Sequence, residues 1–203
     1  VEKSKGTFDN DLLEALAGGV GPDMFLITDD LAFKYSDKIF TIPYQSFPLS
    51  AFKSSFVGDG EVFLTSKGIL AFPLAVDPLM MYYNRSMLDA GGIANPPVYW
   101  DEFVKLIPVL LQKDGRGIIT KSPVAMGQFS NVLSAKDILA SLFMQTGNPI
   151  VKEGRDYFVS TLREDEDKYD LASVLKFYTD FADPLKNVYS WNKSFPNSGD
   201  AFS

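Results

Sequence analysis

Short apolar runs alternate with amphipathic stretches in the first third of the chain. Met24–Ile27 is an apolar run between polar flanks, and its length and flanks predict a buried strand. Before it, acidic residues and a Gly-Gly pair bracket Leu12–Ala17 and predict a short amphipathic helix. After it, Asp30 is placed to cap a helix over Leu31–Tyr35. Helix, strand and helix in this order favour a parallel α/β arrangement.

Helical patterns dominate the second half of the chain. Apolar residues recur at helical spacing over Trp100–Gln112, although Pro108 should kink or restart this helix. Ser134-Ala-Lys-Asp137 matches a capping box and predicts the start of the next helix. Apolar positions from Leu171 to Phe181 predict a further one.

The remaining patterns of the second half predict short strands and a loop. Val124–Met126 is expected to form a strand, and Val151–Leu162 a pair of strands around Gly154. Arg163–Lys168 is a run of charges, which we interpret as a solvated loop and not as a metal site.

The segment Phe72–Asn84 is the most informative part of the sequence. An apolar run enters, Asp77 and Pro78 interrupt it, and an aromatic-rich run leaves. A carboxylate that is buried without a partner is costly, so we expect Asp77 where the chain emerges into a polar crevice. The residue before a proline disfavours the helical region, which adds a bend. The segment therefore predicts a strand that crosses from one lobe to another.

An ordered series of motifs surrounds this crossing. Gly21-Pro-Asp23 precedes an apolar strand, and Asn84–Ile93 is followed by Asn95–Phe103, which contains Pro-Pro-Val-Tyr-Trp-Asp-Glu. In this order the motifs resemble the bacterial extracellular solute-binding proteins of ABC importers, the maltose-binding-like family. Tyr99 stands where that family has threonine, so the usual hydroxyl cap is missing, and Asp101 is expected to cap the helix instead.

The resemblance implies an α/β, two-lobed periplasmic-binding-protein-like fold, incomplete at both ends. Its first lobe would cover residues 1–76, the crossover strand 77–84, and a more helical second lobe 85–203. Members of this family bind a small solute, often a sugar, and pass it to an ABC permease in the membrane. The resemblance also implies a monomer that is extracellular or periplasmic, anchored as a lipoprotein in the full-length protein.

Polar and aromatic side chains follow the predicted strands. Ligands of open α/β sheets bind at the carboxyl ends of strands, where carboxylates, amides and rings can hold a polyhydroxylated sugar. The candidate ligand-binding residues are Asp29, Asp30, Asp77, Tyr82, Asn84, Gln128, Phe129, Asn131 and Trp191. In the resembling family, the acid at the position of Asp77 and the polar residue that ends the Gly-Pro-Asp strand bind sugar hydroxyls.

Each of these candidates also has a structural interpretation. Asp29 and Asp30 can serve as helix caps, and Asp77 as a hinge residue held by the backbone. Asn84 can close a turn. Trp191, between prolines in an expected loop, can be an exposed stacking ring or be buried between lobes.

Composition removes several classes of function. The net charge of -7 and the pI near 4.6 argue against a nucleic-acid partner. The chain has no cysteine and no histidine, which excludes thiolate chemistry, serine–histidine triads and histidine-based zinc sites. Tyr82 and Tyr83 are adjacent and would point to opposite faces of a strand, so they cannot grip one metal ion. We expect no cofactor and no metal.

Two other classes of function remain open from the residues. Two suitably separated carboxylates could hydrolyse a glycosidic bond, and exposed aromatic faces could serve a cell-surface interaction module. The identity of the solute is also open, because peptides, polyamines and glycerol phosphates are alternatives to sugars and oligosaccharides. No apolar run reaches the eighteen residues that suggest a membrane-spanning helix.

Overall fold

The chain forms two compact units that are contiguous in sequence. A computed structural model describes residues 4, 6–32, 34–153, 158–162 and 171–202. The first unit is Val1–Asp77 and the second is Pro78–Ser203. The predicted charged loop Arg163–Lys168 lies outside the described residues.

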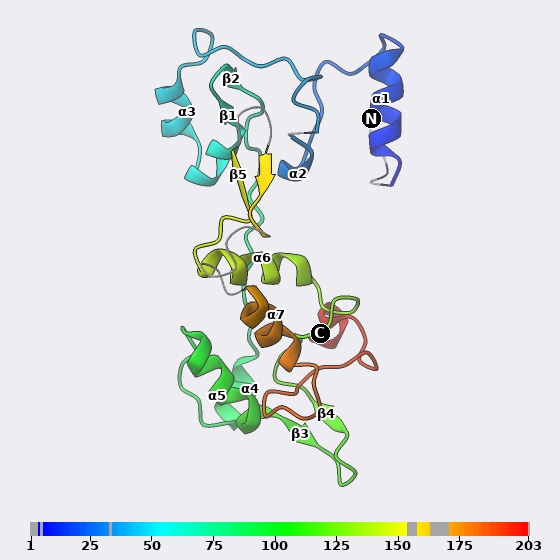
Figure 1. The fold of residues 1–203 in the computed structure, drawn as a ribbon, viewed down its shortest axis with the longest axis vertical. Coiled ribbons are helices and arrows are strands. Elements are labelled where there is room, and N and C mark those ends of the chain that lie inside the picture. The colour runs from blue at the N-terminus through cyan, green and yellow to red at the C-terminus, as the bar shows by residue number, and fades with distance from the viewer. Residues whose placement is uncertain (1–3, 5, 33, 154–157, 163–170, 203) are drawn as a thin grey trace. The chain divides into compact units, whose positions relative to one another are not determined.

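The first unit combines short helices with one small hairpin (Figure 1). Its elements are α1 (Phe8–Ala17), α2 (Asp29–Ala32), α3 (Leu49–Ser55), the 3-10 helix η1 (Gly58–Phe63), β1 (Leu64–Thr65) and β2 (Gly68–Ile69). Helix α1 confirms the predicted amphipathic helix, and Gly18 and Gly19 follow its end. Helix α2 begins one residue before Asp30, so Asp30 lies inside the helix and is not its cap.

Tyr35 connects α1 to the rest of the first unit. Its ring is fully buried, and its hydroxyl donates a 2.6 Å hydrogen bond to Asp9 Oδ1 on α1. Lys34 Nζ pairs with the other oxygen of the same carboxylate. The Phe25 ring lies 6.4 Å from Phe8 and 6.3 Å from Tyr35, which extends this contact into an aromatic row.

Met24–Ile27 does not form the predicted buried strand. No ladder pairs this segment among the described residues, and Met24 and Leu26 are 89% and 73% exposed. Phe25 and Ile27 are half-buried, so alternate side chains face the unit. An apolar run needs a hydrogen-bonding partner as well as flanks to become a strand, and the described chain provides none.

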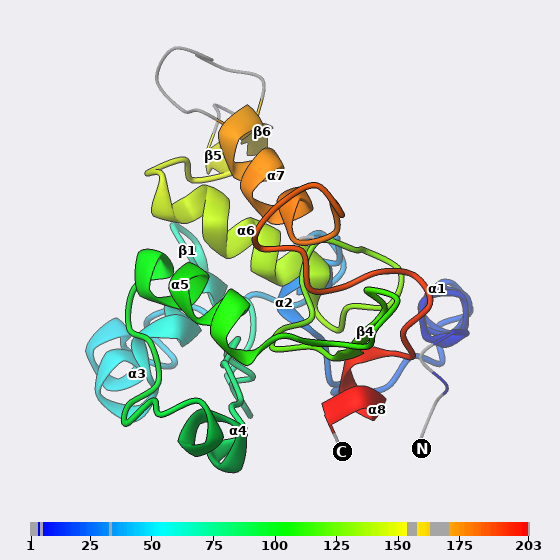
Figure 2. The same ribbon diagram turned by 90° about the horizontal axis from the view of Figure 1, so that it is seen from below.

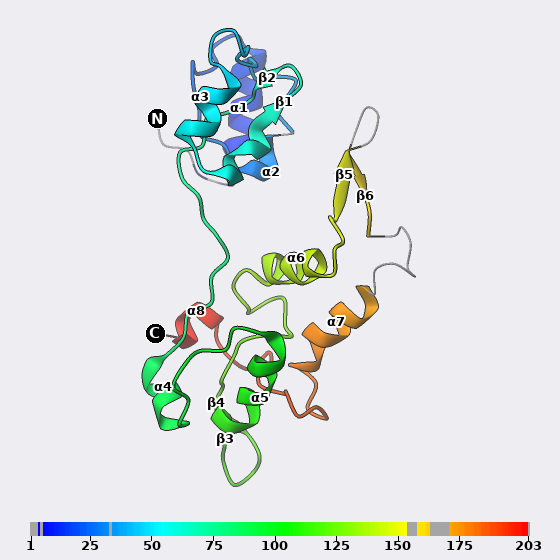
Figure 3. The ribbon, with the colours of Figure 1, turned by 90° about the vertical axis from the view of Figure 1, so that its left-hand side faces the viewer.

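The strand that was expected to cross between lobes at Phe72–Asn84 is also absent. Figure 3 shows an extended trace between β2 and α4, and no hydrogen bond joins the backbone of residues 71–83 to the described part of the chain. The Phe72 ring still packs in the first unit, 5.1 Å from Phe47. Asp77 is exposed, not enclosed, and the boundary between the units follows it.

Helices form the core of the second unit (Figure 2). Its elements are α4 (Arg85–Ala90), α5 (Trp100–Leu110), β3 (Gln112–Lys113), β4 (Ile119–Lys121), α6 (Ala135–Gln145), β5 (Val151–Glu153), β6 (Phe158–Ser160), α7 (Leu171–Asp180) and α8 (Ser198–Phe202). Ile107 of α5, Leu142 of α6 and Tyr178 of α7 belong to one buried cluster. All three long helices were predicted, α5 and α7 from their apolar stripes and α6 from a capping box, and the structure confirms the helices. The capping box itself is not formed, because Ser134 makes no side-chain cap hydrogen bond.

Two local details of these helices differ from prediction. Helix α5 continues past Pro108 to Leu110 without restarting. Its first turn is capped by Glu102, whose carboxylate accepts from the backbone N–H groups of Val98 and Tyr99, and not by Asp101. A glutamate at the third helical position can reach back to the chain before the helix, and Tyr99 has no short hydroxyl with which to cap.

The described strands pair in local hairpins, and Ile69 of β2 also forms an isolated antiparallel bridge with Ile42. The pairs β1–β2, β3–β4 and β5–β6 are all antiparallel, so the described residues contain no parallel pair. The predicted pair within Val151–Leu162 is confirmed by β5 and β6. The strand predicted at Val124–Met126 is wrong, because Met126 is buried in the core without joining a ladder.

Candidate functional site

Three of the predicted ligand residues belong to the first unit. Asp29 and Asp30 are the first two residues of α2, where negative charge is favourable beside the exposed N–H groups of the helix start. The side chain of Asp29 is exposed. Asp77 is exposed at the last position of the unit. Among the described side chains of the first unit, no hydrogen bond or ion pair joins Asp77 to Asp29.

Asn84 serves as the N-cap of α4 in the second unit. Its Oδ1 accepts a 3.1 Å hydrogen bond from the backbone N–H of Met87. This bond satisfies one of the free donors at the start of the helix, which favours the structural interpretation of Asn84.

Two loops of the second unit bring several predicted residues together. We call the segments Gly127–Leu133 and Ser190–Ser198 the paired loops. Asn131 Nδ2 donates 3.0 Å hydrogen bonds to the backbone oxygens of Asn192 and Phe195. The backbone N–H of Ser198 donates in turn to the oxygen of Asn131, at 2.9 Å. The backbone N–H of Leu133 also donates a 2.8 Å hydrogen bond to Ser198 Oγ, so the paired loops are joined through Asn131 and through Leu133.

The first of the paired loops is also fixed onto α7. Tyr178 donates from its hydroxyl to the backbone oxygen of Gln128 at 2.7 Å, and burial raises the pKa of this tyrosine. Gly127 has a φ of 90°, and a Cβ there would lie 2.5 Å from the backbone nitrogen of Ala182. Only glycine fits this position, so the direction in which the loop leaves the core is set by the close approach to the turn that follows α7.

Trp191 is part of the core and is not an exposed ring. It is 3% exposed and stacks on Phe195 with ring centroids 4.4 Å apart and planes 13° apart. The prediction of an exposed loop tryptophan is wrong. Flanking prolines mark a loop, but they do not reveal whether the loop folds back over apolar helices, as this one does.

Three buried polar atoms in the paired loops have no hydrogen-bond partner among the described residues: Asn131 Oδ1, Ser190 Oγ and Trp191 Nε1. Such an atom costs about 1–3 kcal/mol when it is left unsatisfied. They comprise one acceptor, one donor and one hydroxyl that can do both, and none of them is charged. Sequence reasoning missed Ser190, which carries no signal beyond its place beside Trp191.

Exposed aromatic rings lie on both sides of the paired loops. Phe129, within the first loop, is 69% exposed, and Tyr82 is 78% exposed. The Tyr82 ring lies 6.5 Å from Phe202 of α8, the helix that continues from the second loop (Figure 3). The second unit thus places Asn131 and the accessible Tyr82 ring beside α8, and a second accessible ring, Phe129, in the first of the paired loops. Such groups are able to contact a polar organic solute.

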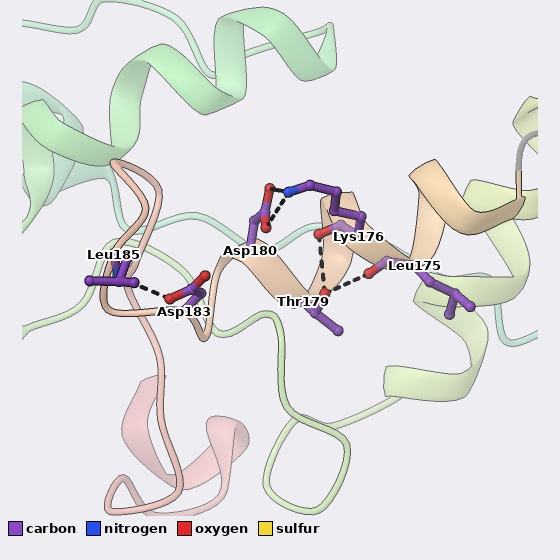
Figure 4. A network of polar contacts seen from close by, with 6 residues as sticks. All are labelled: Leu175, Lys176, Thr179, Asp180, Asp183 and Leu185. Carbon is purple, nitrogen blue, oxygen red and sulfur yellow. Dashed lines mark hydrogen bonds and ion pairs between the residues drawn. The ribbon is translucent and has the colours of Figure 1, made fainter.

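A hollow of about 520 Å³ lies elsewhere in the second unit, where no predicted site residue is found. It is lined by Pro108, Leu111, Lys113, Pro184, Leu185, Lys186, Asn187 and Tyr189. Lys113 Nζ lies 5.8 Å from the centre of the Tyr189 ring. Figure 4 shows the adjoining end of α7, where Lys176 donates to both carboxylate oxygens of Asp180. The carboxylate of Asp183 accepts a hydrogen bond from the backbone N–H of Leu185.

Within the part of the chain that the structure describes, no cluster of three or more aspartate or glutamate side chains is arranged to hold a metal ion. In the same residues, no helix has both the length and the apolar character needed to span a membrane.

Comparisons with known proteins give one informative similarity. Over 91 residues, 43% of this chain, the sequence is 26% identical to proteins of Brucella abortus and Brucella suis, each named "putative binding protein". The match spans 21% of the length of these relatives. No protein-family model matches the chain, and no solved structure gives a significant match. The similarity relates this chain to proteins that are named for binding.

Proposed function

We propose that this chain is part of the substrate-binding component of an ABC importer. In this proposal a small solute, a sugar or an oligosaccharide, is captured in a cleft between two α/β lobes, which close over it. The lobes are those expected from the sequence, 1–76 and 85–203, joined by the crossover 77–84. The closed form then delivers the solute to an ABC permease at the outer face of the membrane, where a lipoprotein anchor holds the full-length protein.

The paired loops are the observation that supports this proposal most. They carry the exposed Phe129 ring and three uncharged polar groups, of Asn131, Ser190 and Trp191, that are buried without a hydrogen-bond partner among the described residues. Neutral donors and acceptors next to an aromatic face suit a hydroxyl-rich solute, whose C–H face packs on a ring. The similarity to proteins named for binding points in the same direction.

Solute binding can be tested by isothermal titration calorimetry against a panel of mono- and oligosaccharides. We expect saturable binding to one member, and Phe129→Ala should weaken it about tenfold, which corresponds to the loss of one ring contact of about 1.4 kcal/mol. Leu185→Ala is the matched control, because Leu185 is 90% exposed in the same unit and lies away from the paired loops. Equal affinities for both variants would remove the paired loops from the site.

The same preparation separates binding from catalysis. Chromogenic glycosides should bind without being hydrolysed, because the proposal requires no covalent step. Turnover that is lost in Asp77→Asn or Asp29→Asn would instead establish a carboxylate-based hydrolase.

A further inference from the structure

The most unusual surface of the molecule is the extended segment that follows Asp77. Residues 79–83 are all apolar or aromatic and all exposed, with Met80 at 67% and Tyr82 at 78%. Their backbone N–H and C=O groups have no hydrogen-bond partner in the described chain. A segment with these properties can receive another strand along its edge.

The sequence of this segment is self-complementary in the antiparallel sense. If two copies pair antiparallel about Met81, Leu79 lies opposite Tyr83 and Met80 lies opposite Tyr82. The same register places Pro78, which has no N–H, opposite Asn84 at the end of the ladder. Every central position therefore meets an apolar or aromatic partner, which is the pairing that stabilises neighbouring strands.

Charge selects this register and orientation. In this register Asp77 of one copy is brought towards Arg85 of the other, the residue at which α4 begins, and the symmetry repeats this approach at the opposite end. A parallel pairing in register would instead set Asp77 against Asp77. For the exchange, Arg85 leaves its pair with Asp89, which is formed between side chains that are 57% and 55% exposed and contributes little in water, and its 2.9 Å hydrogen bond to the backbone oxygen of Ala94.

We propose that residues 77–85 form a homotypic docking site, in which two copies of this chain add their extended segments to each other as an antiparallel two-stranded ladder. The partner is a second copy, because the centre of the segment is apolar and uncharged, with an acid, Asp77, before it and a base, Arg85, after it. A second copy in the antiparallel orientation brings the acid of each copy to the base of the other. One strand per copy buries less than the roughly 1,000 Å² of a stable interface, so the dimer is weak and depends on concentration. The inference is independent of the proposed solute.

Sedimentation equilibrium of the full 203-residue chain tests the inference. A reversible monomer–dimer equilibrium is expected. Met81→Asp should weaken it by about tenfold or more, since the two copies of this residue face each other at the symmetry axis and would bring two carboxylates together. Leu185→Asp adds the same charge at a site that is 90% exposed and should leave the equilibrium unchanged. A chain that stays monomeric, or a dimer indifferent to Met81→Asp, would overturn the inference.

A charge exchange tests the register. Asp77→Arg and Arg85→Asp should each weaken self-association, because each homodimer then carries two pairs of like charges. An equimolar mixture of the two variants should recover association to about the wild-type level, since both end pairs are again opposite in charge. Far-UV circular dichroism shows whether each variant is folded. Absence of recovery between two folded variants would refute this register.

Discussion

The joining of the paired loops through Asn131 leads to a quantitative prediction for Asn131→Leu. Leucine has the same branched shape and the same number of side-chain heavy atoms as asparagine but is bulkier and can form neither hydrogen bond, so no cavity is left. Two neutral hydrogen bonds to the oxygens of Asn192 and Phe195 are lost, at about 1–1.5 kcal/mol each. Removing the buried and unpaired Oδ1 returns about 1 kcal/mol. The net expectation is a destabilisation of about 1–2 kcal/mol.

Urea unfolding followed by tryptophan fluorescence measures this change in the relevant unit alone. Both tryptophans of the chain, Trp100 and Trp191, belong to the second unit, so the signal reports no unfolding of the first. With a slope of about 2 kcal/mol per molar urea, the midpoint should fall by about 0.5–1 M. The stacking of Trp191 on Phe195 should loosen as well and shift the native emission maximum to longer wavelength.

The control for this measurement is Asn187→Leu, which changes an exposed asparagine of the same unit and should alter stability by no more than about 0.5 kcal/mol. If Asn131→Leu unfolds at the same urea concentration as this control, the two hydrogen bonds do not hold the loops together. If Asn131→Leu is more stable than wild type, the unpaired Oδ1 of Asn131 costs more free energy than its two hydrogen bonds contribute, and the predicted sign is wrong.

Two further predictions concern the anchoring of α1 and the start of the first paired loop. Hydrogen bonds from Lys34 and Tyr35 lower the pKa of Asp9, so this carboxylate stabilises the fold above its unfolded pKa of about 3.9, and the stability is lost as the pH falls through the lower folded value. The hydrogen bond to Asp9 raises the pKa of Tyr35 to about 12. The stability that protonated Tyr35 contributes is therefore complete below about pH 10 and is lost as the pH rises through 12. Asp9→Asn should reduce both the acid and the alkaline pH dependence of stability, measured by circular dichroism. Gly127→Ala should destabilise the second unit by about 1–3 kcal/mol in urea unfolding. Gly92→Ala is the control, because Gly92 also has a positive φ but has open space around it, and this variant should cost less. Equal costs for the two variants would contradict the close approach of Gly127 to Ala182.

The helices were predictable because their signals are local. The apolar stripe of α5 and the glutamate at its third position lie within one short stretch of sequence, and both appear in the structure. Strands require partners that a single stretch cannot specify. Met24–Ile27 has the composition of a buried strand, yet nothing in the sequence indicates whether another segment will pair with it.

The candidate site shows the same division. The sequence suggested Gln128, Phe129 and Asn131 as candidate ligand-binding residues, and all three lie in the first of the paired loops. The residues that hold this loop could not be predicted, because the partners of Asn131 lie 61 and 64 positions away. Trp191 was selected for its exposure, and its burial depends on the helices α5, α6 and α7 that meet beneath it.

The two proposals assign Asp77 to different partners, and this makes them testable against each other. A carboxylate that holds a solute hydroxyl cannot at the same time face Arg85 of a second copy. If both proposals hold, solute binds the monomer alone, and linkage requires that the solute dissociate the dimer while dimerisation weakens solute binding by the same free energy. At a free solute concentration about 100 times its dissociation constant, each monomer gains about 2.7 kcal/mol, and the apparent dimerisation constant falls by about 10⁴ because two monomers are released. Sedimentation with saturating solute measures that fall directly. A dimer that persists unchanged while the solute is bound would show that Asp77 serves at most one of the two partners.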